Sequence, residues 1–219
     1  MAAAMTFDSL RNTDFPAYVE RGFVNDPVVY DQVPSLINLA ERDIVTTLKI
    51  LGFLNPVNGT MTAGVAVYPK PDRWRGTASI NFGVGDPALD LQERVDLFPR
   101  AYEYCNQYWS NRALRAQPEF YADYDYSHIL VVPTPDQDYP FEWNYWQQPP
   151  LLDDVNQTNW LTDFAPNLLL YGTLVQSFPF LKDGPWKEQW KGMYTDELSS
   201  INTQELQRVI DRTTVRRTV

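Results

Sequence analysis

The amino-acid sequence predicts an α+β fold in which a helical bundle from the N- and C-terminal segments holds a β-rich insertion. Apolar residues recur every three or four positions from Val33 to Leu51, which is typical of one buried face of a helix. Apolar and polar residues alternate in several short runs of the middle part, as in half-buried strands. Helical spacing returns after Pro149-Pro150. Consecutive runs of each type favour separate helical and β parts over an alternating α/β sheet.

These runs predict two domains that are not both continuous in sequence. Residues 1–57 and 149–219 are expected to form the helical bundle, which ends in a C-terminal arm. Residues 58–148 are expected to form the β-rich insertion. The first boundary is indicated by a change in residue pattern at Asn55, where helical spacing ends and a turn-rich stretch begins.

Two helices are predicted before this boundary. A helix is predicted over residues 6–21, with Thr6 as its N-cap. Pro16 lies inside this stretch, which predicts a break or a late start of the helix. The helix from Val33 has a proline in its first turn, where proline is tolerated, and Gly52 is a plausible stop.

The predicted insertion consists mainly of strands with one short helix. The alternation of Met61, Ala63, Val65 and Val67 predicts its first strand. Pro99 opens a stretch that predicts a helix ending near Trp109. The further strands are predicted over residues 79–84, 95–98, 119–124, 127–132 and 139–147.

Three helical stretches are predicted after the insertion. Residues 166–181 contain no charged side chain, which indicates a helix that is buried on most sides. Asp183 is expected to cap the next helix. Asn202 and Glu205 have the spacing of a capping box, which predicts that the helix restarts there.

Composition excludes several classes of protein. The chain has 219 residues, of which 44% are hydrophobic and 21% charged, as in a folded protein with a sizeable core. A single cysteine cannot form an internal disulfide, and a single histidine cannot form a zinc-binding histidine cluster. Nucleotide-binding and hydrolase motifs, a membrane span and a signal peptide are not recognised in the sequence. We therefore predict no enzymatic activity, no cofactor, no metal site and no membrane association.

Charge is distributed unevenly along the chain. The formal net charge is −10, and residues 116–181 contain nine acidic residues but no Lys or Arg. The last twelve residues have a charge of +3, from four arginines and one aspartate. Such asymmetry is typical of two surfaces with different partners. An acidic chain without a basic stripe in its middle is not expected to bind nucleic acid by neutralising phosphates.

Three arrangements of residues leave chemical alternatives open. Cys105 and His128 could form a nucleophile and its base, but no orienting motif accompanies them. Trp143 and Trp146 lie next to acidic residues, as in surfaces that bind or cleave glycans. Oxygen ligands for calcium could come from acidic turns, without the loop of a known calcium motif. The four aspartates concerned are Asp123, Asp125, Asp136 and Asp138.

Many segments, in sequence order, resemble one family. The strongest are TNWL at 158–161, APNLLLYG at 165–172 and FPFLKD at 178–183, followed by Trp190, Met193-Tyr194, Leu198 and Ile201-Asn202. The segments at 32–41, 121–124 and 145–149 also fit. On these residues the chain resembles the head-to-tail adaptor proteins of tailed bacteriophages, which are also called connector or neck proteins.

The resemblance implies a structural protein of the virion, made in the host cytoplasm and placed at the head–tail junction. Such adaptors form a ring, usually of twelve copies, below the portal of the filled head, and DNA passes through their lumen without specific binding during ejection. The expected partners are the portal protein, a downstream neck or tail protein and further copies of the chain. Another tail-attachment protein of the virion, or a glycan-binding structural protein, is the alternative.

The resemblance also assigns site residues. The C-terminal arm, residues 208–219, is expected to bind the portal through Arg208, Arg212, Arg216 and Arg217. The acidic residues expected to face the lumen or the tail are Asp123, Asp125, Asp136, Asp138 and Glu142. No catalytic residue is assigned.

Overall fold

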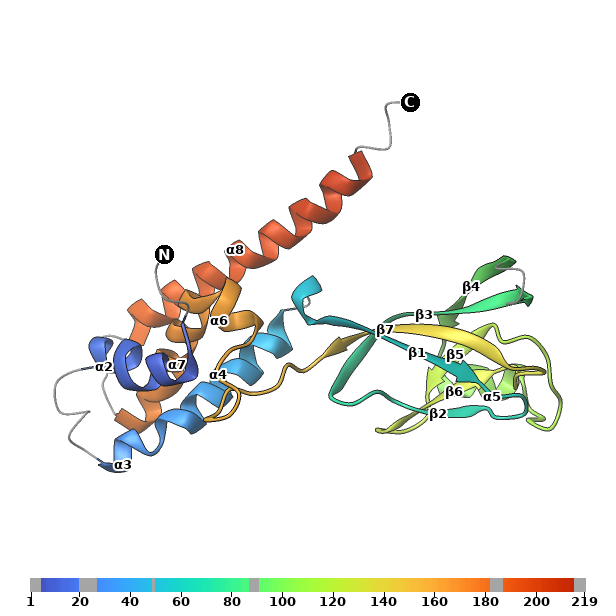
Figure 1. Ribbon diagram of the computed structural model, residues 1–219, viewed down its shortest axis with the longest axis horizontal. Helices are drawn as coiled ribbons and strands as arrows, with labels where there is room; N and C mark the ends of the chain where they lie inside the picture. Colours follow the sequence, from blue (N-terminus) through green and yellow to red (C-terminus); the bar gives the residue numbers. More distant parts are fainter. Residues whose placement is uncertain (1–4, 20–26, 49, 87–90, 182–186, 215–219) are drawn as a thin grey trace. The chain divides into compact units, whose positions relative to one another are not determined.

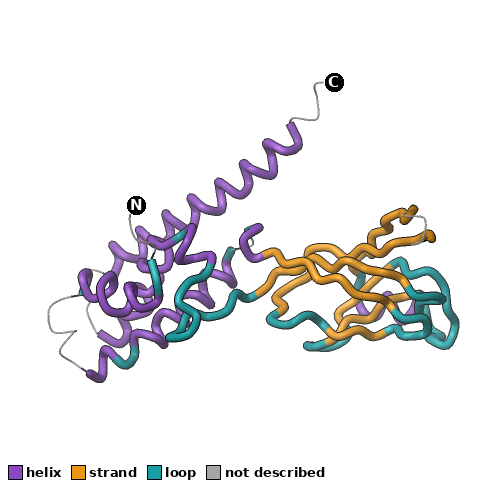
Figure 2. Tube along the Cα trace, in the orientation of Figure 1, coloured by secondary structure: helices purple, strands orange, loops and turns teal. Residues whose placement is uncertain are grey.

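The computed structural model divides into two compact units (Figure 1). The helical unit consists of Met1–Phe53 and Gln148–Val219, and the β unit consists of Leu54–Gln147. The structure describes residues 5–19, 27–48, 50–86, 91–181 and 187–214. Figure 2 shows that the strands, drawn in orange, all belong to the β unit. Whether each unit folds by itself remains a prediction.

The helical unit contains three long helices and several short turns. Thr6 starts the first turn with a capping box, in which its side chain accepts a hydrogen bond from the Ser9 amide. The segments are α1 (Phe7–Ser9), η1 (Leu10–Asp14), α2 (Phe15–Tyr18), α3 (Pro27–Tyr30), α4 (Val33–Thr47), η2 (Leu51–Phe53), α6 (Trp160–Phe164), α7 (Pro166–Leu181) and α8 (Lys187–Thr214).

Helix α7 lies at the centre of this unit, and both α4 and α8 pack against it. Four of its leucines are buried, as its lack of charged residues predicts: Leu168, Leu169, Leu170 and Leu174. Gly172 permits the close approach, because a Cβ atom there would lie 3.3 Å from both the Cβ of Ala40 on α4 and the ring of Tyr194 on α8. A central apolar helix held between two others accounts for the core of the unit.

A buried carboxyl group ties α4 to the segment that precedes α6. Glu41 is only 1% exposed. Its two oxygens accept hydrogen bonds from the Leu152 amide at 3.0 Å and from Nδ2 of Asn159 at 2.6 Å. Asn159 is in turn the N-cap of α6. One side chain thus joins α4 to a segment more than 100 residues later in the sequence.

The β unit is built on one seven-stranded sheet with the strand order β1-β7-β3-β4-β5-β6-β2. The pairs are antiparallel, except that β4 and β5 are parallel. The strands are β1 (Leu54–Met61), β2 (Val67–Pro69), β3 (Trp74–Asp86), β4 (Leu91–Pro99), β5 (Phe120–Asp123), β6 (His128–Val132) and β7 (Tyr139–Gln147). The helix α5 (Tyr102–Tyr108) lies between β4 and β5 in the sequence.

Two clusters of buried residues stabilise the β unit. The larger one contains Ile80 and Phe82 of β3 together with Trp143 and Tyr145 of β7, whose side chains point to the same face of the sheet. In the smaller one, Cys105 of α5 packs against β5 and β6. The alternation that predicts these strands therefore reflects real burial on one face.

The α+β class is confirmed, but the prediction of a helical bundle with a β-rich insertion is wrong. The dominant element is the seven-stranded sheet, and α8 continues past Ile201, which is the last of its described residues to pack on the helical core. Helical periodicity shows that each helix buries one face, but not which helices meet. The sheet depends on pairs such as β1 with β7, which are distant in sequence and leave no local signal.

Two predicted elements also differ from the structure. The first strand of the β unit ends at Met61 instead of beginning there, because Gly64 turns the chain with a φ of +80°. The predicted restart at Asn202 does not occur, since α8 runs without a break from Lys187 to Thr214. The hydroxyl of Thr203 bonds back to the Ser199 carbonyl within this helix. A capping sequence does not end a helix whose backbone continues.

Candidate interaction surfaces

Asp123 is the last residue of β5, and Asp125 lies between β5 and β6; residues 123–127 are here called the Tyr126 loop. Asp123 forms an ion pair with Nζ of Lys70 at 2.8 Å. Asp125 accepts hydrogen bonds from the Ser127 amide at 2.6 Å and from Nδ1 of His128 at 2.9 Å. Desolvation acts to raise the pKa of Asp125, but these hydrogen bonds outweigh it and lower the pKa. Both carboxylates therefore stabilise the loop, and the lowered pKa keeps Asp125 negatively charged.

Asp136 and Asp138 lie in the loop between β6 and β7. Asp136 accepts a hydrogen bond from the hydroxyl of Tyr139 at 2.7 Å. Asp138 accepts one from the Ala63 amide at 2.8 Å, which fastens this loop to the turn after β1. The two side chains are exposed but have structural partners.

Glu142 lies on β7, on the face of the sheet opposite the buried tryptophan. It is paired in register with Asn58 on β1 and with Asn81 on β3, and it accepts a hydrogen bond from Asn144 at 3.0 Å. In the described part of the chain, no three His, Cys, Asp or Glu side chains lie close enough together to hold a metal ion.

Cys105 has the environment of a structural residue. Its side chain is buried against Leu130 and Val132 of β6, and desolvation by burial raises the pKa of the thiol. A raised pKa keeps the thiol protonated, which is the inactive form of a nucleophile. His128 is bound to the Asp125 carboxylate instead. The geometry gives no support to a nucleophile and base.

The two tryptophans proposed for glycan binding occupy different environments. Trp143 is 2% exposed, and its indole N–H donates a hydrogen bond to the Thr77 hydroxyl at 3.1 Å. A ring that is buried in this way cannot stack on a sugar. Trp146 is half-buried over Gly76 of β3. Of the two tryptophans in the glycan-binding alternative, Trp143 is therefore not available to bind a sugar.

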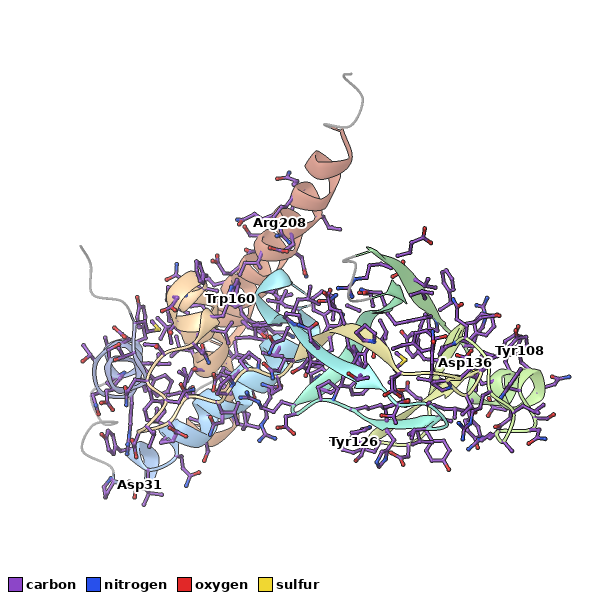
Figure 3. All side chains as sticks on the ribbon, turned by 45° about the vertical axis from the view of Figure 1, so that its right-hand side comes forward. Asp31, Tyr108, Tyr126, Asp136, Trp160 and Arg208 are labelled. Atoms are coloured by element: carbon purple, nitrogen blue, oxygen red, sulfur yellow. The ribbon has the colours of Figure 1, made fainter. Side chains whose placement is uncertain are left out.

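The predicted basic arm begins on α8. Arg208, labelled in Figure 3, lies on this helix. It forms an ion pair with Glu205, three residues before it. Arg212 follows one turn later within α8, and its side chain is outside the described part of the chain. Arg216 and Arg217 lie outside the described residues. The structure thus places the start of the arm on a helix, and the arm's binding role remains a prediction.

One surface was missed in the sequence. Arg100, Tyr104 and Tyr108 follow one another at intervals of four residues, so that they line one side of α5 and its approach. The rings of Tyr104 and Tyr108 are stacked at 6.0 Å, and both meet the ring of Phe120 edge to face. The spacing in the sequence is a signal for one helix face, but the contact with β5 is not local.

Comparison with known proteins identifies one family. The family model described as SU10 adaptor protein matches residues 5–218. A comparison with curated proteins found no match. Among the described helices, none is both long enough and apolar enough to cross a membrane.

Proposed function

Because this chain belongs to the SU10 adaptor protein family, a family of structural head-to-tail adaptors of phages, we propose that it forms a ring below the portal. The ring, of twelve copies by analogy with such adaptors, extends the DNA channel from the head toward the tail. It provides the platform on which a neck or tail protein docks. In this proposal the protein is placed at the head–tail junction of the virion after synthesis in the host cytoplasm.

The observation that supports portal binding best is the length of α8. Its 28 residues correspond to about 42 Å of helix. The half nearest α7 packs on the helical core through Trp190, Tyr194, Leu198 and Ile201. Beyond Ile201 no described residue of α8 belongs to that core, and Leu206 is 64% exposed. A helix that continues past its own core offers an apolar and basic surface to a partner.

The charge of the arm favours an acidic groove on the portal. Arg208 and Arg212 lie on one helix, and Arg216 and Arg217 follow it in the sequence. Arginine forms bidentate hydrogen bonds with carboxylates, which gives both affinity and orientation. At physiological ionic strength, salt screens the interaction between exposed charges that lie more than about 8 Å apart. Binding to the portal is therefore expected to weaken as the salt concentration rises.

The acidic residues suit the second part of the proposal, passage of DNA. Asp123, Asp125, Asp136 and Asp138 are exposed. Carboxylates that face a channel repel phosphates, so that DNA slides past without being bound. We propose that these residues, with Glu142, face the lumen or the tail side.

Truncation after Asn202 tests the role of the arm. The shortened protein is expected to keep its fold, because Ile201, the last described α8 residue that packs on the core, remains. It is expected to lose binding to the portal protein from the same genome, as measured by co-sedimentation. If the shortened protein binds the portal with unchanged affinity, the arm has no part in docking.

Two variants, each with two charge reversals, distinguish the contribution of the arm to portal binding from that of the start of α8. Arg208→Glu with Arg212→Glu changes the charge of the arm, and Lys187→Glu with Lys191→Glu makes the same change at the start of the helix. The first variant is expected to lose affinity for the portal by at least about tenfold, as for charged hot spots. The second is expected to bind like the unmodified protein. Equal losses in both would show only a general effect of charge.

A further inference from the structure

An exposed group of aromatic rings surrounds an arginine where β4, α5 and β5 meet. The aromatic–arginine cluster, as we call it, consists of Phe98, Arg100, Tyr104, Tyr108 and Phe120. Phe98 and Phe120 are paired in the parallel register of β4 and β5. Phe98 is 58% exposed, and the two tyrosines are exposed as well. Protein interfaces are enriched in Tyr, Phe and Arg, so this composition is that of a binding surface.

Arg100 is held in place by contacts with aromatic rings. Its guanidinium group lies 5.3 Å from the centre of the Phe120 ring and 5.7 Å from that of Tyr104. Its guanidinium group donates a long hydrogen bond of 3.5 Å to the Pro99 carbonyl. Among the described residues, no carboxylate lies within ion-pair distance of it. A guanidinium group oriented by aromatic rings is ready to bind a carboxylate.

The same unit offers a complementary projection at the other end of β5. The cluster contains Phe120, the first residue of β5, whereas the Tyr126 loop begins at Asp123, the last residue of that strand. Tyr126 is 93% exposed at the tip, between β5 and β6. Asp123 and Asp125 belong to the same loop and give it negative charge. Figure 3 labels Tyr108 and Tyr126 at separate places on the β unit.

We propose that in the ring the Tyr126 loop of one copy docks on the aromatic–arginine cluster of the next copy. The contact joins two different surfaces of the same chain, which is the heterologous kind that a closed ring requires. The ring of Tyr126 packs among exposed aromatic rings, and the negative loop approaches the guanidinium group of Arg100. This inference rests on the proposed ring. It adds which surfaces of the β units are in contact between neighbouring copies.

The loop is preorganised for this contact. The Ser127 amide and His128 both bond to the Asp125 carboxylate, which fixes the turn that presents Tyr126. Less side-chain and loop entropy is lost on binding when a loop is already ordered. Asp125 and Asp123 are therefore left unchanged in the tests below, because their replacement would alter the loop itself.

Photo-crosslinking of the full chain with the portal protein tests the contact directly. A photoreactive phenylalanine at position 126 is expected to form crosslinks between copies that map to the aromatic–arginine cluster, within residues 98–108 or at Phe120. The same probe at position 155, which is 94% exposed in the helical unit, is expected to give none there. If rings form but position 126 crosslinks elsewhere or not at all, the docking proposal is overturned, whereas the proposed ring is not. Failure to form any ring would overturn the proposed function as well.

A double-mutant cycle gives an independent result. Tyr126→Ser and Arg100→Ser are each expected to raise the concentration needed for half-assembly by about tenfold or more. If the two residues meet across the interface, the double variant shows a smaller change than the product of the two single changes. Leu114→Ser, at another exposed apolar residue of the β unit, serves as the control with unchanged assembly. Fully independent effects of the two substitutions would contradict a shared contact.

Discussion

Glu41 places a carboxyl group inside the helical unit, where its charged form is poorly solvated. Desolvation by burial raises the pKa of Glu41 and outweighs the hydrogen bonds from Leu152 and Asn159, while the nearby Asp153 also acts to raise it. The folded protein therefore binds this proton more tightly than the unfolded chain does. The contribution to stability is full below the unfolded-state pKa of 4.5 and is lost as the pH rises through the higher folded-state pKa.

A comparison with Glu41→Gln isolates this effect, because the other acidic residues titrate alike in both proteins. Urea unfolding is measured from pH 4 to pH 8 for the two proteins. The unmodified protein is expected to lose stability relative to the glutamine variant as the pH rises. A relative stability that increases with pH would mean that the folded-state pKa is lowered instead.

The Thr77 hydroxyl accepts hydrogen bonds from two indole N–H groups at once. Removing this hydroxyl is therefore expected to lower the unfolding free energy. The hydroxyl oxygen accepts hydrogen bonds from Nε1 of Trp74 at 3.2 Å and from Nε1 of Trp143 at 3.1 Å. Thr77→Val leaves the buried N–H of Trp143 without this acceptor and is expected to cost about 1–3 kcal/mol of unfolding free energy. Thr77→Ser keeps the hydroxyl and is expected to cost less. Denaturant unfolding of both variants provides the check, and equal costs would refute the hydrogen-bond explanation.

At the scale of elements, two glycines within helices differ in their surroundings. A Cβ atom at Gly192 of α8 would meet nothing within 4 Å, whereas one at Gly172 of α7 would meet α4 and α8 at 3.3 Å. Alanine stabilises a helix interior by about 1 kcal/mol relative to glycine. Gly192→Ala is therefore expected to raise the unfolding free energy by about that amount.

Gly172→Ala is the matched variant, since it makes the same change in the neighbouring helix. Crowding against Ala40 and Tyr194 is expected to remove the gain or reverse it. Thermal unfolding of both variants measures the difference. An equal gain at the two positions would show that α7 is packed less closely than the structure indicates.

Elements with a strong local signal were predictable from the sequence. The periodicity of residues 33–51 predicts α4, although this helix ends at Thr47, and the uncharged run from Pro166 predicts α7. The alternation in residues 139–147 predicts β7. The order of strands was not predictable, because the pairing of β1 with β7 and of β4 with β5 depends on contacts between distant segments. For the same reason the sequence predicted a helical bundle where the sheet dominates.

The surfaces were predictable to a smaller degree. The charge asymmetry of the sequence drew attention to five acidic residues, and the structure distributes them over two loops and the face of a strand. The sequence could not show that Trp143 is buried or that Phe120 meets Tyr104 and Tyr108, since both facts follow from tertiary packing. Exposure is a property of the folded chain, which composition does not reveal.

At the scale of the whole molecule, the chain passes between its two units at neighbouring points. Leu54 is paired with Trp146, and Nδ2 of Asn55 donates a hydrogen bond to Oε1 of Gln147 at 2.9 Å. We therefore expect the fragment 54–147 to fold by itself, with both of its ends in the sheet. Circular dichroism with a cooperative thermal transition would support this. A fragment without near-ultraviolet signal from its buried Trp143 would contradict it.

The proposed function requires that this adaptor assembles as a ring on the portal. Light scattering combined with electron microscopy of the full-length protein, with and without the portal protein from the same genome, tests it most directly. We expect a complex whose mass and images correspond to a ring of twelve copies below the portal. A protein that remains a monomer in the presence of the portal, or binds it without forming a ring, would contradict the account.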